Sequence, residues 1–235
     1  MSETRRALLL ASVTSFALFV LLGVAVHLGW SASTAYDGPS AAIREWAVKQ
    51  PGLEAPLLFV ERVLGNQGMA VATAVLAGVL LLRRQVRSAL LVVVVMFAAR
   101  ELTQYFKDLF GRDRPAWQDP DLLLQSGSYP SSHAATVVAF AALVLGLTIL
   151  GSRRRSTRGL VGAGALLLVL VVCADRVLLG RHYPTDLLGG ALLGTGLVLL
   201  GLALLHPLPV ARERDASLPG GAPLGDRELE VSRAA

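Results

Sequence analysis

The sequence predicts an all-α polytopic membrane protein with six transmembrane helices. Of its 235 residues, 54% are hydrophobic, and they are concentrated in blocks rather than scattered along the chain. Each block is close to the roughly 20 apolar residues that a helix needs to cross a bilayer. Short arginine-rich segments separate some of the blocks, as loops that set membrane topology do. The expected membrane helices cover residues 7–30, 57–82, 88–106, 133–150, 159–173 and 185–206.

The first apolar run, residues 7–30, follows a short basic N-terminus. A secretory signal peptide is the competing interpretation, with Ser31-Ala32-Ser33 as a crude cleavage region. The apolar core of a signal peptide extends over roughly 7–15 residues, and this run is longer. We therefore expect a first membrane helix here.

The connection over residues 31–56 is polar, and its Asp37-Gly38-Pro39-Ser40 segment is typical of a turn followed by a surface helix. We expect no chemistry in this connection. The second helix carries Glu61 and Arg62 in its first part, so it begins near a membrane interface. Both charges are interpreted as surface charges.

The third helix carries charge near its end. Arg100 and Lys107 are seven residues apart and therefore share one helical face. That face could look into a polar cavity, or the two long side chains could extend to the interface; the sequence leaves both open. A polar loop over residues 107–130 follows, and Ser131 is a suitable N-cap for the fourth helix.

The C-terminal half continues the alternation. A basic loop at residues 153–158 precedes the fifth helix, which could extend toward Leu179. Cys173 is the one cysteine of the chain, so no internal disulfide can form, and we expect a small core residue. Residues 207–235 are rich in proline, glycine and charge and are expected to form a disordered cytoplasmic tail after one membrane domain over residues 1–206.

The net charge of +5 could indicate a nucleic-acid partner. We reject that interpretation because the arginines lie in short loops between apolar runs, without the interleaved aromatic residues that stack on bases. The N-terminus and residues 83–87 and 153–158 are basic and fall on one side of a six-span protein. The positive-inside rule makes that side cytoplasmic, and we expect a multi-pass protein of the plasma membrane.

The opposite, extracytoplasmic side would then carry several basic residues that topology does not require. A functional role would explain them. They adjoin the starts of the fourth and sixth helices, whose N-terminal dipoles attract negative charge. These basic residues are Lys107, Arg112, Arg114, Arg176 and Arg181. The sequence therefore predicts that the two helix ends and several of these cations could converge on one anion.

The stretch from Arg176 to Asp186 carries the clearest signs of chemistry. His182 could act as nucleophile or base, and Asp186 could orient it. Pro184 is a favourable first residue for the following helix. An anion site beside an imidazole and a carboxylate indicates phosphate chemistry. The alternative is an interfacial loop whose charges only anchor helix ends.

Three blocks of residues strengthen the first interpretation. They are Lys107, six residues and Arg114-Pro115; then Pro130-Ser131-Ser132-His133; then Arg176, five residues, His182, three residues and Asp186. Together and in this order, they resemble the motifs of the type 2 phosphatidic acid phosphatase superfamily. These are lipid phosphate phosphatases related in fold to vanadium haloperoxidases, so the resemblance implies the same helical bundle.

The resemblance implies a role for each matched residue. His182 would attack phosphorus and form a phosphohistidine, and Asp186 would hold its imidazole in the required tautomer. His133 would protonate the leaving oxygen and then activate water. Phosphate would be bound by Lys107, Arg114, Ser131, Ser132 and Arg176, whose cations suit the charge of the transition state. No metal and no cofactor are expected.

Two positions depart from the family pattern. Ser132 replaces the usual glycine, which would cause strain if the loop required a positive φ there. Asp175 replaces the serine that usually precedes the arginine; its carboxylate would repel phosphate unless it pairs with Arg176 or faces away. Arg112, Asp113 and Arg181 lie outside the matched positions and are interpreted as solvated loop charges.

The expected substrate is a lipid phosphate or diphosphate whose tail stays in the bilayer. Phosphatidate, phosphatidylglycerophosphate and undecaprenyl diphosphate all fit, and the resemblance alone inclines toward undecaprenyl diphosphate recycling. Two other classes stay open: a vanadate-dependent haloperoxidase, and a transport or structural membrane protein that binds anionic headgroups without catalysis. The sequence predicts the lipid bilayer as partner and leaves the oligomeric state open.

Overall fold

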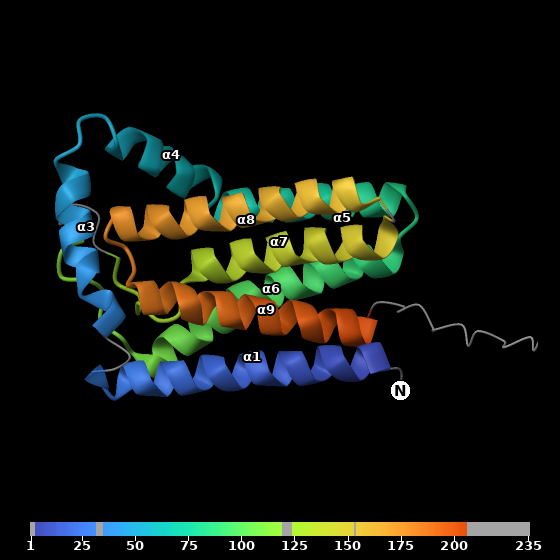
Figure 1. The fold of residues 1–235 in the computed structure, drawn as a ribbon, viewed down its shortest axis with the longest axis horizontal. Coiled ribbons are helices and arrows are strands. Elements are labelled where there is room, and N and C mark those ends of the chain that lie inside the picture. The colour runs from blue at the N-terminus through green and yellow to red at the C-terminus, as the bar shows by residue number, and fades with distance from the viewer. Residues whose placement is uncertain (1–2, 32–34, 119–123, 153, 206–235) are drawn as a thin grey trace, which may run out of the picture.

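The computed structural model describes residues 3–31, 35–118, 124–152 and 154–205, and these form helices and loops without a β-strand (Figure 1). The prediction of an all-α fold is confirmed. The elements are α1 (Glu3–His27), η1 (Ala35–Asp37), α3 (Pro39–Val48), α4 (Glu54–Val63), α5 (Asn66–Leu82), α6 (Val86–Phe110), α7 (Ser132–Gly151), α8 (Arg155–Leu178) and α9 (Pro184–Leu205).

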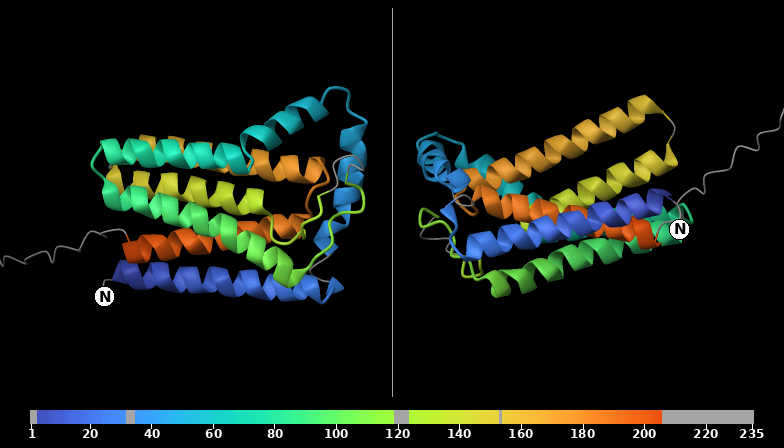
Figure 2. Two further views of the ribbon diagram at one scale, coloured as in Figure 1. Left: turned by 180° about the vertical axis from the view of Figure 1, so that it is seen from behind. Right: turned by 60° about the horizontal axis from the view of Figure 1, so that its bottom comes forward.

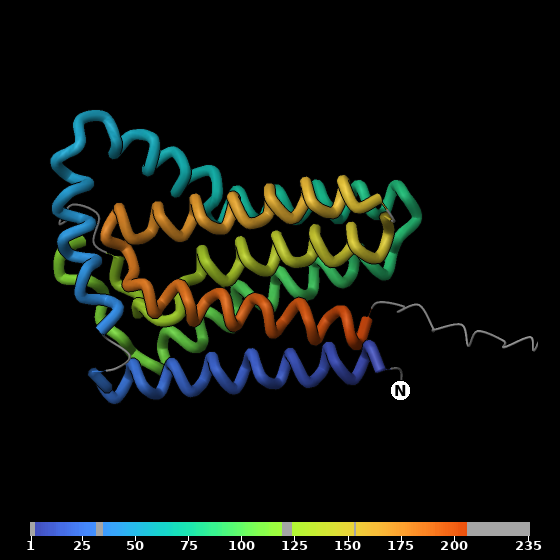
Figure 3. The backbone as a smooth tube through the Cα atoms, in the orientation of Figure 1, coloured from blue at the N-terminus to red at the C-terminus, as the bar shows by residue number. Residues whose placement is uncertain are grey.

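The long helices run side by side, and α9 lies inside the bundle (Figure 3). It packs against α1, α6 and α7. In its most apolar 18-residue window, 61% of the residues are buried, against 17% in α8. The outward faces of the other helices carry large apolar side chains such as Leu10, Val71 and Leu160, each more than 60% exposed. Such faces suit contact with lipid tails, whereas α9 is sheltered by protein.

Two glycines of α9 allow it to approach α7 closely. A Cβ at Gly190 would lie 2.5 Å from the carbonyl oxygen of Ser131, and one at Gly194 would lie 2.4 Å from that of Ala135. Because they are four residues apart, both glycines face α7. The start of α7 is thereby held against the start of α9, and the Ser131 N–H donates to the Asp186 carbonyl at 3.0 Å.

The connections sort to the two ends of the bundle as the sequence predicts. The N-terminus and the loops α5–α6 and α7–α8 lie at one end (Figures 1 and 2). The opposite end carries α3, α4, the loop after α6 and the turn between α8 and α9. The three motif blocks therefore share one end. Which end faces the cytoplasm stays a prediction.

The second predicted helix is wrong as one continuous element. It consists of α4 and α5, bent by 46° at a short break. Gly65 occupies the break, where a Cβ would lie 2.5 Å from the carbonyl oxygen of Glu61. Four described helices (α1, α7, α8 and α9) are long and apolar enough to cross a membrane, and the α4–α5 pair raises the number to five if it is one span.

The predicted total of six spans is not confirmed. The α6 helix is 25 residues long but is not among these candidates, and it carries Arg100 and Glu101 within its length. The predicted tail over residues 207–235 lies outside the described residues. The first predicted span is present as α1, one 25-residue helix packed along α9.

Candidate active site

The three motif blocks meet where α6 ends, α7 begins and α8 turns into α9. Gly111, in the left-handed conformation with φ +56°, ends α6 and directs the chain into the polar loop. Gly180, with φ +66°, follows α8 in the same conformation, and a Cβ there would lie 3.1 Å from the Trp117 side chain. All eight predicted site residues are buried or half-buried in this region: Lys107, Arg114, Ser131, Ser132, His133, Arg176, His182 and Asp186.

His182 and Asp186 form the central pair. The imidazole Nδ1 lies 3.4 Å from the Oδ2 of Asp186, which is fully buried. That same Oδ2 accepts from the Ser128 hydroxyl at 2.5 Å and from the Tyr183 N–H at 2.9 Å. The carboxylate is thus held at several points, and Nδ1 faces it. The imidazole nitrogen on the opposite side of the ring, Nε2, is the one left for a substrate.

The surroundings of His182 keep it neutral. Burial lowers the pKa of its imidazole from the usual 6.5 to about 4, and the nearby Lys107 and Arg114 cations act in the same direction. The hydrogen bond and negative charge of Asp186 oppose this shift without reversing it. At neutral pH the ring therefore carries a lone pair on one nitrogen, as a nucleophile requires.

We expect this protonation state to be measurable. In ¹⁵N-histidine NMR spectra of the detergent-solubilised protein, the His182 signal, assigned by its loss in His182→Ala, should stay that of neutral imidazole as the pH falls from 7 to 5. Protonation should begin only as the pH approaches 4. A midpoint near 6.5 would show that the ring is solvated and would contradict the buried geometry.

His133 lies in the first turn of α7. Ser131 caps the helix by accepting from the Ala134 N–H at 3.4 Å, and His133 Nε2 lies 3.4 Å from Nη1 of Arg176. Ser132 is the first helical residue and has no positive φ, since Arg84 is the one described non-glycine residue with that conformation. The serine that replaces the family glycine is therefore not strained.

Arg176 is 1% exposed and is enclosed by carboxylates. Asp175 accepts from its Nε at 2.9 Å and also from its Nη2. This pairing is one of the two arrangements that would stop Asp175 from repelling phosphate. The prediction that Glu61 is a surface charge is wrong: its Oε1 lies 2.8 Å from Arg176 Nη1 and 3.5 Å from Arg181 Nε. The chain bends at the break that contains Gly65, and α4 packs against α8, which allows this contact.

Lys107 and Arg114 add two more positive charges to the site beside Arg176. Lys107 is 2% exposed, and its ammonium donates to the Gly127 carbonyl at 2.6 Å. Arg114 donates to the carbonyls of Ser126 and Arg181, both at 2.8 Å. Burial, together with the charges of Arg181 and Arg176, lowers the pKa of Arg114 to about 10. The guanidinium stays charged at neutral pH, and the crowding of like charges favours an incoming anion.

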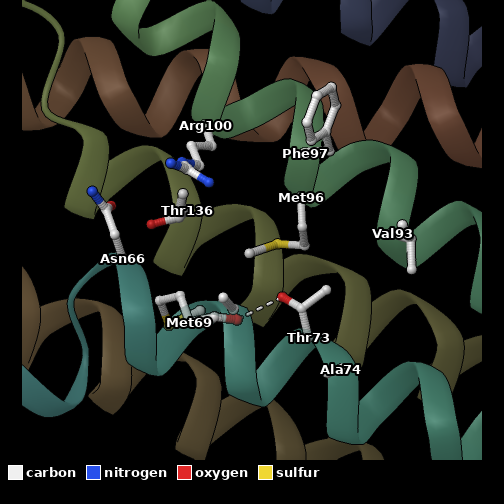
Figure 4. Close-up of a pocket in the computed structure, with 10 residues that line it drawn as sticks. Asn66, Met69, Thr73, Ala74, Val93, Met96, Phe97, Arg100 and Thr136 are labelled. Carbon is white, nitrogen blue, oxygen red and sulfur yellow. Dashed lines mark hydrogen bonds between the residues drawn. The ribbon is translucent and has the colours of Figure 1, made fainter.

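Arg100 and Lys107, which the sequence places on one helical face, differ in their surroundings. Lys107 points into the protein, whereas the Arg100 side chain is 61% exposed beside Glu101. Arg100 lines a groove of about 280 Å³ between α5, α6 and α7, together with Asn66 and Thr136 (Figure 4). The rest of the groove is mainly apolar and includes Met69, Ala74, Val93, Met96 and Phe97.

A larger cavity of about 800 Å³ adjoins His133, one of the two histidine candidates. Its walls include His133, Arg181 and Glu61 and the polar residues Asn66 and Gln67. Asn66 lines both the cavity and the groove, so the two adjoin at the start of α5. Among the residues that the structure describes, no group of three or more His, Cys, Asp or Glu side chains is placed to hold a metal ion.

Two predictions about loop charges are wrong. Arg181 is 3% exposed, and the Arg112 side chain is 11% exposed, so neither is solvated. Arg112 contacts Asp186 and also Asp37, from the connection where we expected no chemistry. Sequence spacing could not reveal this contact, because 75 residues separate Arg112 from Asp37. Asp113, in contrast, is exposed as predicted.

Comparison with known proteins identifies the family. Residues 88–208 match the model of the PAP2 superfamily. The chain is 28% identical to phosphatidylglycerophosphatase B of Bacillus subtilis (strain 168) over 190 residues, which are 77% of this chain and 88% of that protein.

The fold has a solved counterpart. The crystal structure of a transmembrane PAP2-type phosphatidylglycerolphosphate phosphatase from Bacillus subtilis aligns with a TM-score of 0.70 at 24% identity, covering 81% of this chain and 93% of that one. This likeness supports the helical bundle. The family match spans more than half of the chain and contains all three motif blocks. The chain therefore belongs to the PAP2 superfamily and is a membrane phosphatase, a hydrolase of phosphoric esters.

Proposed function

We propose that the protein removes the terminal phosphate of a membrane lipid phosphate, with phosphatidylglycerophosphate as the first candidate, through a phosphohistidine on His182. The observation that carries the proposal is the arrangement around His182. Its Nδ1 faces Asp186, it is neutral at pH 7, and it is bordered by Lys107 and Arg114. A neutral nucleophile among fixed cations suits a dianionic phosphate.

The first step forms one bond and breaks one. His182 Nε2 attacks phosphorus, and the bond between phosphorus and the lipid oxygen breaks. His133 donates a proton to that oxygen, so the lipid leaves as an alcohol. Asp186 stabilises the positive charge that appears on the His182 ring. In the second step His133 takes a proton from water, the resulting hydroxide attacks phosphorus, and inorganic phosphate leaves as the nitrogen–phosphorus bond breaks.

The cations supply the electrostatic stabilisation. Lys107, Arg114 and Arg176 would bind the oxygens of the transferred phosphoryl group, and Ser131 and Ser132 would provide further donors at the start of α7. An arginine fork can hold two oxygens at once, whereas lysine acts as a point charge. We propose that these residues make catalysis independent of a metal ion.

The site's surroundings favour a lipid substrate. The 800 Å³ cavity reaches His133, where the leaving group would receive its proton. The adjoining groove begins with Asn66, Arg100 and Thr136 and continues along apolar residues (Figure 4). A headgroup in the cavity and an acyl chain in the groove would match this change in polarity. Because the chain is similar to phosphatidylglycerophosphatase B, we propose phosphatidylglycerophosphate ahead of phosphatidate and undecaprenyl diphosphate. We further propose that the site opens on the extracytoplasmic face of the plasma membrane.

The direct test is phosphate release by the purified protein in EDTA from matched lipid phosphates and diphosphates. We expect release from phosphatidylglycerophosphate with the highest kcat/KM of the panel. Release only from a polyprenyl diphosphate would move the assignment to that substrate. No release from any lipid by folded protein would favour headgroup binding or transport instead. Bromide oxidation in the presence of vanadate would favour the haloperoxidase.

A bulky residue in the groove should separate long substrates from short ones. Ala74→Trp should raise KM for a long-chain substrate by about tenfold, the loss expected when roughly 1.4 kcal/mol of tail binding disappears. KM for a dioctanoyl substrate should change less. Val75→Trp is the matched control, since Val75 is exposed on the same helix and does not line the groove. Equal effects on both chain lengths would contradict a tail-binding role.

Glu61 should compete with phosphate for Arg176. The Glu61→Gln variant removes one negative charge and keeps the shape, so we expect inorganic phosphate to inhibit at about tenfold lower concentration, equivalent to roughly 1.4 kcal/mol. Asp175 still pairs with Arg176, so the buried guanidinium is not left alone. Glu54→Gln, at an exposed position of the same helix, is the control. An unchanged or weaker inhibition would show that phosphate does not occupy this position.

A further inference from the structure

Asp37 is a buried carboxylate that the family motifs do not include. It is 4% exposed and lies in η1, between α1 and α3. Its Oδ1 accepts from the Thr185 N–H at 3.1 Å, and its Oδ2 accepts from the Thr185 hydroxyl at 2.8 Å. Thr185 is in the first turn of α9, directly before Asp186. The first N–H groups of a helix have no partner within that helix. Asp37 therefore accepts a hydrogen bond from one of them, the Thr185 N–H, at the start of the helix that carries Asp186.

Arg112 connects Asp37 to Asp186. Its Nη2 donates to Asp37 Oδ2 at 2.6 Å, and its Nη1 donates to Asp186 Oδ1 at 2.6 Å and to the Thr185 hydroxyl at 2.7 Å. The guanidinium also lies over the Tyr183 ring, 4.1 Å from its centre. Burial disfavours the charged guanidinium, but Asp186 and Asp37 outweigh burial and raise its pKa. Arg112 is thus a fixed cation between two buried carboxylates.

The two carboxylate oxygens of Asp186 have different hydrogen-bond partners. Oδ1 accepts from Arg112, whereas Oδ2 faces His182 Nδ1 and also accepts from Ser128 and Tyr183. A carboxylate bound on both oxygens cannot rotate about its χ2 bond without losing charge-assisted hydrogen bonds. The Arg112 donors at both ends of its fork are used by carboxylates, so this arginine is not oriented to bind phosphate as Arg114 would be.

We propose that Arg112 and Asp37 are positioning residues that hold Asp186 against the nucleophilic histidine and set the charge that His182 experiences. This inference rests on the proposed role of His182. Asp37 fixes the start of α9 and the far end of Arg112, and Arg112 fixes Asp186. A segment between the first two long helices thereby becomes part of the catalytic machinery, although it contacts no substrate.

The charges around His182 define what each variant should do. Asp186 faces the ring and favours its protonation, whereas Lys107 and Arg114 disfavour it. Arg112 offsets part of the Asp186 charge, and Asp37 offsets part of the Arg112 charge. Removing the cation with Arg112→Gln should raise the pKa of His182. Removing the carboxylate with Asp37→Asn should leave that pKa unchanged or lower it.

The experiment measures both the titration and the kinetics. For Arg112→Gln we expect kcat to fall about 100-fold, as small misplacement of a catalytic group does, with KM and inhibition by inorganic phosphate changed less than about threefold. For Asp37→Asn we expect a smaller fall in kcat, because asparagine retains the shape and an acceptor for Thr185. Arg112→Lys should recover only part of the activity. Lysine keeps the positive charge, but it lacks the guanidinium fork that bridges two carboxylates.

Controls separate positioning from loss of structure. Glu45→Gln removes one member of an exposed ion pair with Lys49 and should change neither the titration nor the kinetics. Arg114→Gln, by contrast, should weaken inhibition by inorganic phosphate as well as lower kcat, because Arg114 would bind the phosphate itself. A loosened, hydrated site would move the His182 pKa toward 6.5 in both Arg112→Gln and Asp37→Asn. A rise in Arg112→Gln without a rise in Asp37→Asn therefore distinguishes positioning from loss of structure.

Two outcomes overturn different statements. If His182→Ala is inactive while Arg112→Gln retains wild-type kcat and an unchanged His182 titration, the positioning role is wrong and the proposed function stands. If His182→Ala retains full activity, the proposed nucleophile is wrong. A rise in KM with constant kcat in Arg112→Gln would make Arg112 a phosphate-binding residue and would also overturn the inference.

Discussion

Replacing His182 with alanine should abolish phosphate release from the lipid substrate in EDTA. We expect kcat to fall by about 10⁴-fold or more, as it does when the nucleophile is removed from a set of catalytic residues that act as a unit. The physical reason is that the cations can still bind phosphate, but the neutral ring nitrogen that faces away from Asp186 is gone. Malachite-green detection of phosphate, with substrate binding measured separately, checks both parts of this expectation.

His27→Asn is the matched histidine control. His27 ends α1 and hydrogen-bonds the Phe110 carbonyl through Nδ1 at 2.7 Å, a contact that the asparagine amide can imitate. It is not one of the motif residues, so the variant should retain activity. Phosphate release by His182→Ala at the wild-type rate would exclude His182 as nucleophile or reveal a contaminating phosphatase; repeating the assay on an independent preparation distinguishes these.

Replacing His133 with asparagine should slow the reaction in a way that depends on the leaving group. A lipid alcohol is a poor leaving group and needs a proton, so kcat should fall by about 10²–10⁴-fold, the range of general acid–base catalysis. An aryl phosphate with an acidic phenol leaves without protonation, and its first step should be much less affected. The expected result is a burst of phenol followed by slow turnover, because the second step still needs a base.

The slow second step should make the intermediate visible. In His133→Asn, brief reaction with labelled aryl phosphate should leave acid-labile, alkali-stable label on the protein, as expected for a phosphohistidine, and the double variant with His182→Ala should carry none. An equal loss of rate for lipid and aryl substrates, without a burst, would contradict the role of His133 as acid and base. His133 would then act by holding Arg176, whose Nη1 lies 3.4 Å away.

Helices that depend on local composition could be predicted closely. The fourth predicted helix, residues 133–150, differs by one residue at each end from α7. The sixth, residues 185–206, begins one residue after the start of α9, and its predicted last residue lies outside the described residues. The start and length of these helices follow from local sequence features: a long apolar run, and Ser131 or Pro184 at its N-terminal end. The alternation of polar and basic loops also predicted which connections share an end of the bundle.

Contacts between distant segments could not be predicted from these patterns. Glu61 reaches Arg176 only because the chain bends at Gly65, and a broken helix of this kind has the same apolar composition as a straight one. From the sequence, Arg112 is expected to be solvated, because a charged side chain in a polar loop usually is. Its burial depends on Asp37 and Asp186, two carboxylates supplied by other parts of the chain.

The helical membrane fold, the family and the order of the three motif blocks could be predicted from the sequence, because apolar length and residue spacing can be read along the chain without knowing how the helices pack. How the blocks combine could be learned only from the packing of the helices. The structure shows that α4 packs against α8, that Lys107 points inward while Arg100 does not, and that Asp37, Arg112 and Asp186 form one chain of contacts. The reason is that a buried charge is stable only beside its partners, and those partners are brought together by helix packing rather than by sequence spacing.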